Sequence, residues 1–310
     1  MVMKRYRLLS IAVLLLLSSC VNINLQQTEP TPNVIVETAL PTQEVTNIPA
    51  QAAGLTEAVL LNSEYLSPSQ GKAIKLVEGK FSGLVDGVEL SASIEPGIQF
   101  GDLNGDGVDD AALLLAENTG GTGTFVSMIV IFSKDGKFQQ APGVTIDDRP
   151  IIDSMVISEG KVQVKGYVHG PNDAMINPTQ GVTQEYTLVG ENLFLTRLNS
   201  AISSGGERAI VIDAPVEGEQ VSGSVRVSGS MPIAPFENTL LLQILDANRN
   251  ELYSSAFIVQ AADIGQPATF DNTIPLPAIS SGSTVVLLLK ELSMADGSPL
   301  TISSVIFTIK

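Results

Sequence analysis

One short acidic segment, residues 102–110, carries the residue types best suited to binding a metal ion. Its oxygen-bearing side chains recur at loop positions 1, 3, 5 and 9, which are Asp102, Asn104, Asp106 and Asp110. Gly107 permits a sharp turn at position 6, and the main-chain carbonyl of Val108 is available at position 7. A hard cation such as Ca²⁺ binds about six to eight oxygens, and alternate residues of a tight loop can direct them inward. The spacing therefore predicts a structural Ca²⁺ site formed by the four side chains and this carbonyl.

The same segment has an alternative interpretation that needs no ion. Position 12 is Leu113, so the bidentate glutamate of an EF-hand is missing. Asp and Asn side chains also accept hydrogen bonds from nearby N–H groups, which would make the segment an acidic turn. The pattern resembles the Asp-x-Asn-x-Asp-Gly-x-x-Asp loop of FG-GAP and related β-repeat proteins, which implies a strand on either side. It occurs once, so a propeller of repeats is not predicted.

Residues suited to catalysis are few outside this loop. The single histidine, His169, precedes a Gly-Pro-Asn-Asp turn; as a functional residue it would be a general base beside a carboxylate. The Gly-rich segment 119–124 lacks the spacing and the lysine of a phosphate-binding loop. Two Ser-x-x-Lys sequences, beginning at Ser69 and Ser158, have no partner motifs. The sequence therefore predicts no catalytic and no cofactor-binding residue, and a protein that is not an enzyme.

The N-terminal residues predict where the protein works. Three basic residues precede an apolar run at 8–17, which is shorter than the roughly 20 residues of a membrane-spanning helix. The run leads into Leu-Ser-Ser-Cys at 17–20. This arrangement resembles the lipobox of bacterial lipoproteins, which implies a signal peptide at 1–19 and a lipid attached to Cys20. An ordinary secretory signal or an uncleaved anchor is the alternative.

The charge balance narrows the class of partner. The chain has 33 acidic and 17 basic residues; removal of residues 1–19 takes three basic and no acidic ones, which changes the formal net charge from −16 to −19. Such a surface argues against nucleic acid, because phosphates are bound through Lys and Arg. It also argues against docking on anionic lipid, so the acyl chains at Cys20 are the predicted membrane attachment. With Cys20 lipidated, no thiol is left for a disulfide.

The segments that must position the acidic loop follow a β pattern. Residues 20–53 are rich in Pro, Thr and Gln, which predicts a lipid-anchored disordered tether. Residues 54–199 predict a β-rich domain that carries the acidic loop. Within it, an apolar run at 125–132 leads into a Lys-Asp-Gly-Lys turn, and Glu-Gly at 159–160 predicts a second hairpin. A short helical turn within 56–62 would make this domain α+β, which is the alternative fold class.

A second linker is predicted at 200–207, where two serines precede two glycines. Residues 208–310 contain short β-branched segments separated by turn residues, which is typical of an immunoglobulin-like β-sandwich. Val225-Arg-Val-Ser-Gly229 and Leu245-Asp-Ala-Asn248, among others, resemble the immunoglobulin-like domain associated with bacterial spore-germination proteins. That resemblance implies a non-enzymatic sandwich found on envelope lipoproteins and secreted proteins. The predicted fold class is mainly β throughout.

Together these features predict a lipoprotein anchored to the cell membrane and facing outside the cytoplasm. It would act as a non-enzymatic binding or envelope-interaction module for a protein or an envelope polymer. The alternative is a carboxylate-dependent hydrolase of envelope polymers, with its cleft in residues 55–198. A deep cavity lined by converging acidic side chains would favour the hydrolase, whereas flat sheets with dispersed charges would favour the binding module.

Overall fold

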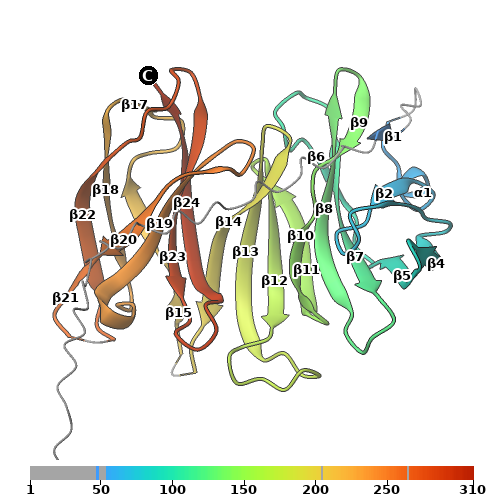
Figure 1. The fold of residues 1–310 in the computed structure, drawn as a ribbon, viewed down its shortest axis with the longest axis horizontal. Helices are drawn as coiled ribbons and strands as arrows, with labels where there is room; N and C mark the ends of the chain where they lie inside the picture. The colour runs from blue at the N-terminus through green and yellow to red at the C-terminus, as the bar shows by residue number, and fades with distance from the viewer. Residues whose placement is uncertain (1–46, 49–53, 204, 264) are drawn as a thin grey trace, which may run out of the picture. The chain divides into compact units, whose positions relative to one another are not determined.

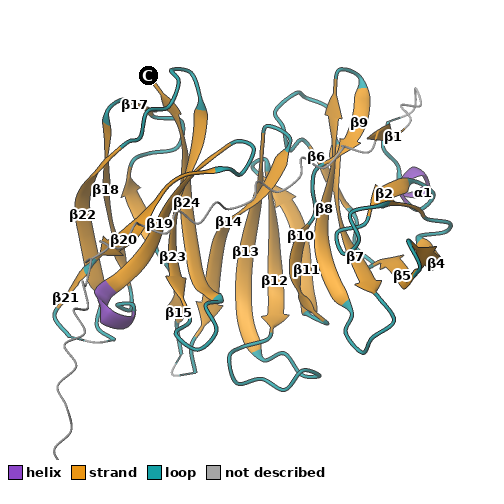
Figure 2. Ribbon diagram, in the orientation of Figure 1, coloured by secondary structure: helices purple, strands orange, loops and turns teal. Residues whose placement is uncertain are grey.

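The computed structural model describes residues 47–48, 54–203, 205–263 and 265–310. Cys20, the predicted signal peptide and most of the predicted tether (20–46 and 49–53) lie outside the described residues. The described chain is almost entirely β, as predicted, with one short α-helix and one 3-10 helix, η1 (Phe236–Asn238), shown in Figure 2. No helix in this part of the chain is long and apolar enough to cross a membrane.

The first sheet in the chain has eight strands (Figure 1). They are β1 (Asn47–Ile48), β4 (Lys80–Val85), β5 (Val88–Ile94), β6 (Gln99–Gly101), β7 (Asp110–Asn118), β8 (Phe125–Lys134), β9 (Lys137–Gln140) and β10 (Val144–Asp148). Their order is β1-β9-β8-β7-β5-β4, with β10 paired to β8 and β6 paired to β7. Two residues of the predicted tether therefore form a strand, β1, which pairs with β9.

The second sheet has ten strands, and a third sheet of four strands faces part of it. The second sheet contains, in spatial order, β11 (Ile151–Ser158), β12 (Lys161–Val168), β13 (Gln180–Val189), β14 (Asn192–Ala201), β24 (Pro299–Ile309), β23 (Thr284–Leu292), β19 (Thr239–Asp246) and β20 (Glu251–Ile258). Two short strands complete it: β15 (Glu207–Arg208) pairs with β14, and β17 (Gln220–Val221) pairs with β24. The third contains β16 (Val211–Ala214), β18 (Ser224–Met231), β22 (Ala268–Pro275) and β21 (Gln260–Ala261).

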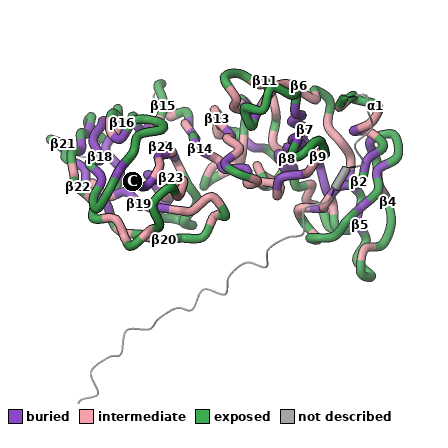
Figure 3. The backbone as a smooth tube through the Cα atoms, turned by 90° about the horizontal axis from the view of Figure 1, so that it is seen from above, coloured by how far each residue is buried: buried purple, intermediate pink, exposed green. Residues whose placement is uncertain are grey.

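Strands β7 and β8 are buried along nearly their whole length. In β7, Leu114 and Ala116 point into the core shared with β11–β14, whereas Leu113 and Leu115 point into a second core on the opposite face. A strand that is covered on both faces has a continuous apolar sequence, because neither face meets water. This explains the run at 125–132, which forms β8 as predicted. In Figure 3 the buried backbone is purple, while β4, at the edge of the sheet, is mostly exposed.

A small layer covers the second face of the first sheet. It consists of α1 (Glu57–Leu60) and the hairpin of β2 (Glu64–Leu66) and β3 (Ala73–Lys75). The helix begins at the predicted turn, where Thr56 Oγ1 accepts a hydrogen bond from the N–H of Val59. Leu60 and Tyr65 are fully buried in this layer.

The predicted hairpin turns are present. The turn between β8 and β9 has positive φ at Asp135 (51°) and Gly136 (73°), and the turn between β11 and β12 has positive φ at Glu159 (52°) and Gly160 (69°). Two successive positive φ values match the right-handed twist of the paired strands. Glycine in the second position adopts such a backbone without strain.

The C-terminal residues form an immunoglobulin-like β-sandwich. Its core lies between the third sheet and strands β19, β20, β23 and β24 of the second sheet. The short β-branched segments of residues 208–310 lie in strands of the sandwich, whereas β22 has a weaker sequence signal. Its inward residues Ala268 and Phe270 alternate with polar ones, and Asp271-Asn272 has the composition of a turn.

The ten-stranded sheet runs through both parts of the chain, because β14 pairs with β24 (Figure 1). The pairs are Arg197 with Ser303 and Leu198 with Ile302, and Thr301 Oγ1 donates to the carbonyl of Leu198 at 2.7 Å. We call this junction the seam. The predicted linker at 200–207 is largely a hairpin, since its ends belong to β14 and β15, which pair with each other. Independent folding of the two parts stays a prediction.

Candidate functional site

The acidic loop joins two paired strands, which is the strand–loop–strand unit expected from its sequence. Strand β6 ends at Gly101 and β7 begins at Asp110, and these two residues are opposite each other in the antiparallel pairing. Gly105 (φ 78°) and Gly107 (φ 81°) have backbone conformations that favour glycine. The loop therefore reverses the chain within eight residues, 102–109.

Asp110 is fully buried and ties this loop to β8. Its Oδ2 accepts hydrogen bonds from the N–H groups of Leu103 (2.8 Å) and Asn104 (3.2 Å), and its Oδ1 accepts one from the N–H of Ser133 (2.8 Å). Burial raises the pKa of Asp110, although the hydrogen bonds from Ser133 and Leu103 oppose the increase. Of the predicted ligands, Asp110 is thus the one that serves the packing of the strands.

The other predicted side-chain ligands close the loop on itself. Asp102 accepts from the N–H groups of Gly105 (2.7 Å) and Gly107 (2.9 Å). Asp106 Oδ1 accepts from the N–H of Val108 (2.8 Å), and Asn104 Oδ1 accepts from the N–H of Asp106 (2.9 Å). These are the Asx-type bonds of the alternative interpretation.

Ser133 on β8 fixes the position of Asp106. Its hydroxyl donates to Asp106 Oδ2, which also accepts from Asn104 Nδ2 at 3.2 Å. The bond from Ser133 is the largest cause of the lowered pKa of Asp106. The loop is therefore anchored to β8 through both Asp106 and Asp110.

The predicted Ca²⁺ ligands fall into two groups in the structure. The structure brings Asp102, Asn104 and Asp106 into one turn, while Val108 has its side chain 44% exposed and Asp110 points inward. Within residues 54–203, 205–263 and 265–310, no three His, Cys, Asp or Glu residues gather in a way that holds a metal. Asp102, Asn104 and Asp106 each have an oxygen with a further lone pair, so a hydrogen bond to the loop and coordination of an ion are compatible. The Ca²⁺ site stays a prediction.

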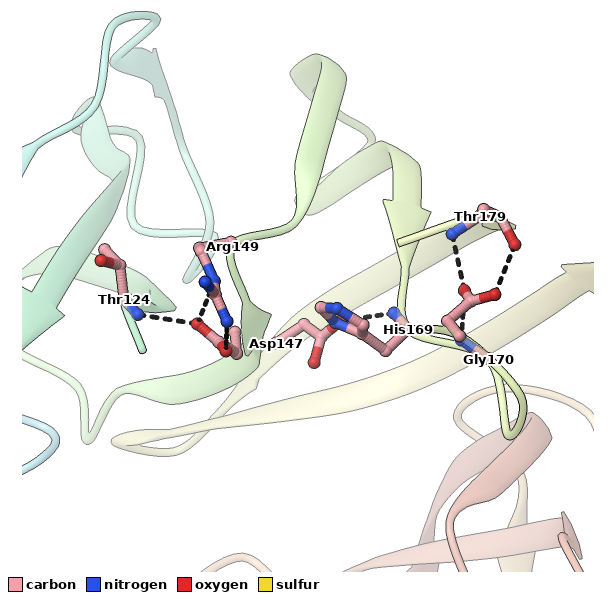
Figure 4. Close-up of polar contacts among 8 residues, drawn as sticks. Thr124, Asp147, Arg149, His169, Gly170 and Thr179 are labelled. Carbon is pink, nitrogen blue, oxygen red and sulfur yellow. Dashed lines mark hydrogen bonds and ion pairs between the residues drawn. The ribbon is translucent and has the colours of Figure 1, made fainter. Parts of the chain in front are cut away.

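His169 lies beside a carboxylate, as its functional interpretation required (Figure 4). Its Nδ1 is 2.9 Å from Asp147 Oδ2, and its main-chain N–H donates to the same oxygen. Nε2 is buried and has no hydrogen-bond partner among the described residues. A general base must reach the proton that it removes from a substrate, and the buried Nε2 is not accessible for this. The geometry therefore supports a structural role, in which His169 links the end of β12 to β10.

Two further aspartates fix the loops around His169 (Figure 4). Asp173 accepts from the N–H groups of Gly170 and Thr179 and from the Thr179 hydroxyl; this hydroxyl bond is the largest cause of a pKa lowered to about 2. Asp148 accepts from Arg149 and from the N–H of Thr124, at the end of the Gly-rich segment. Burial would raise the pKa of Asp148, but these bonds outweigh it and the pKa is lowered.

Sequence reasoning missed a cavity of about 410 Å³ between β11 and the segment that joins β5 to β6. Leu114, Val126 and Met155 are buried parts of its lining, and Glu95 and Asp153 lie nearer the solvent. These residues are far apart in the sequence, so no motif could have indicated them. A second, more open hollow of about 380 Å³ has serine residues of β4 and β5 in its lining.

Comparison with known proteins identifies one part of the chain. Residues 209–298 match the family model of the immunoglobulin-like domain of bacterial spore germination. The match covers most of the C-terminal sandwich and ends just before β24. No curated protein matches the chain.

Proposed function

We propose that this protein is an extracytoplasmic lipoprotein that acts as a non-enzymatic binding module for an envelope polymer or protein. The observation that carries the proposal is the match of residues 209–298 to the immunoglobulin-like domain of bacterial spore germination. Together with β24, the matched residues form a sandwich with a closed apolar core, a rigid scaffold that presents loops and strand edges to partners.

The perturbed carboxyl groups support binding over hydrolysis. A glycosidase-type general acid needs a carboxyl group with a raised pKa that can reach the substrate. Among the described residues, Asp110 and Glu291 have raised pKa values, in both cases mainly because they are buried. Asp110 accepts three main-chain hydrogen bonds, and Glu291 pairs with Arg208. Neither residue lines the 410 Å³ cavity.

Cosedimentation with purified bacterial cell walls tests the binding role directly. We expect the folded protein to pellet with the walls and the heat-unfolded protein to pellet less, with no release of soluble sugars or peptides. Release of reducing ends or peptides in proportion to protein concentration would favour the hydrolase. A folded protein that stays in the supernatant and releases nothing would contradict the binding proposal.

The proposed anchor is the lipid at Cys20, which lies outside the described residues. Basic residues, a short apolar run and small residues precede this cysteine. Cys20→Ser should abolish labelling by a radioactive fatty acid and move the protein from the membrane fraction to the medium or the periplasm. Ser19→Ala, which keeps a small residue beside the cysteine, is the matched control. Continued labelling of Cys20→Ser would end the lipoprotein proposal.

A further inference from the structure

The 410 Å³ cavity opens where the two sheets of the N-terminal part meet. Leu114 and Val126 come from β7 and β8 of the first sheet, and Met155 comes from β11 of the second. All three are at most 9% exposed and form an apolar part of the lining of the cavity. Its volume falls within the range of about 300–1,000 Å³ that is usual for small-molecule sites.

Two carboxylates, Glu95 and Asp153, are among the residues that line this cavity. Glu95 follows β5, where its main-chain N–H continues the pairing with β7 by donating to the Leu114 carbonyl at 2.9 Å. Asp153 belongs to β11 and is exposed. Neither carboxylate forms a hydrogen bond or an ion pair with another residue of the described chain.

A β-bulge sets the place of Asp153. Ile152 pairs with Gly166 and Ser154 pairs with Lys165, so Asp153 is the extra residue of β11. Bulges redirect a side chain and are frequent beside functional sites. The opposite strand must come unusually close here, because a Cβ on Gly166 would lie 2.1 Å from the carbonyl oxygen of Ile151.

The charge around the cavity is negative. No lysine or arginine is among the described residues that line it. Arg149, which precedes the lining residue Pro150, is held by both oxygens of Asp148, at 3.0 and 2.5 Å. Anionic ligands are therefore disfavoured, whereas a cationic ligand would meet carboxylates that have no countercharge.

We propose that this cavity binds a primary alkylammonium group on a short hydrocarbon stem, as in a lysine side chain. The stem contacts Leu114, Val126 and Met155, and the ammonium group pairs with Glu95 and Asp153. The apolar side chains in the lining distinguish this ligand from a metal ion, which requires oxygen ligands on most sides. The inference deepens the proposed binding function, on which it rests, by naming the chemical class of the ligand.

Titration of the protein with Nα-acetyl-lysine methylamide, followed by ¹H–¹⁵N NMR, tests this inference. Saturable shifts are expected at Gly97, Ser154 and Met155 at millimolar concentration, and they should weaken with added salt. The norleucine analogue, which has the same stem and no charge, should cause much smaller shifts. A diamine of matching length distinguishes a free amine from a residue within a peptide, because only the lysine analogue offers peptide groups to the edge of β11.

The double variant Glu95→Gln/Asp153→Asn should weaken binding of the lysine analogue by about fivefold or more, as expected for two surface charge pairs. Glu64→Gln, which removes one exposed carboxylate of β2 away from the cavity lining, should leave the affinity unchanged. Equal binding of the norleucine analogue, or an unchanged affinity in the double variant, would overturn the inference. So would the absence of saturable shifts in the wild-type protein, whatever the cosedimentation with cell walls shows.

Discussion

At the scale of single residues, the carboxylate of Glu291 becomes buried when the protein folds. It is 3% exposed on β23, where Oε1 pairs with Arg208 and Oε2 has no partner among the described residues. Burial raises its pKa, and Arg208 opposes the increase. Because the folded-state pKa is raised, the contribution of this group to stability is present at low pH. That contribution is lost as the pH rises through the folded-state pKa.

Glu291→Gln should therefore gain stability relative to the wild-type protein between about pH 4 and pH 7, by on the order of 1 kcal/mol. Arg208→Gln should instead lower the free energy of unfolding, because it leaves the buried carboxylate without its countercharge. The loss should be larger at pH 7 than at pH 4. Urea unfolding at several pH values measures both effects. Parallel pH curves for the wild-type protein and Glu291→Gln would contradict the assignment.

The acidic loop poses a second question at this scale, which is whether Ca²⁺ adds to its hydrogen bonds. A cation that binds only the folded protein stabilises it by about 2.7 kcal/mol at a hundredfold excess over Kd. We expect the melting temperature to rise with millimolar Ca²⁺ and to fall with a chelator, and Asp106→Ala to lose this dependence. An equal melting temperature in both conditions, after metal has been stripped, would leave the hydrogen-bonded turn as the whole role of the loop.

At the scale of elements, the hairpin of β11 and β12 depends on one glycine. A methyl group on Gly166 would collide with main-chain atoms of Ile151, which cannot rotate away as a side chain can. Gly166→Ala should therefore destabilise the protein by about 1–3 kcal/mol, as overpacking does. Gly121→Ala, where a Cβ would meet open space, is the matched control and should change little. Denaturant unfolding of the two variants gives the comparison, and equal stability would show that the bulge is adaptable.

At the scale of the whole molecule, the seam contains an apolar cluster of its own. Val286 and Leu288 of β23 and Ile302 of β24 pack against Phe194 and Leu198 of β14. Strand β23 is thus buried on both faces, because Val285, Leu287 and Leu289 point into the core of the sandwich. The continuous apolar run at 285–289 reflects this double burial, which a sandwich with one solvated face would not require.

Expressed alone, residues 207–310 should fold and self-associate, because the seam face of β23 and β24 would be exposed to water. Leu288→Thr in this fragment should reduce the association. Light scattering and circular dichroism measure the mass and the fold. A monomeric folded fragment would show that the seam cluster contributes little, and an unfolded one would show that the sandwich depends on β14.

The accuracy of the sequence predictions follows the range of the interactions. Asp135-Gly136, Glu159-Gly160 and the Thr56 cap were predictable because each acts within a few residues. The pairing of Leu198 with Ile302 and the presence of Glu95 and Asp153 in one cavity lining were not, since they depend on how distant strands align. Val286 and Leu288 looked like ordinary core residues, because periodicity alone does not reveal which element covers each face.

The position of β24 has a consequence for the order of folding events during synthesis. This strand is the last in sequence order, yet it lies between β14 and β23 and also pairs with β17. A chain that emerges from its N-terminus can therefore close the core of β7, β8 and β11–β14 early, while the edge of β14 waits for a partner about a hundred residues behind it. Until β24 arrives, that open edge is exposed to other chains. Chaperones that hold the nascent protein would have their greatest effect in this interval.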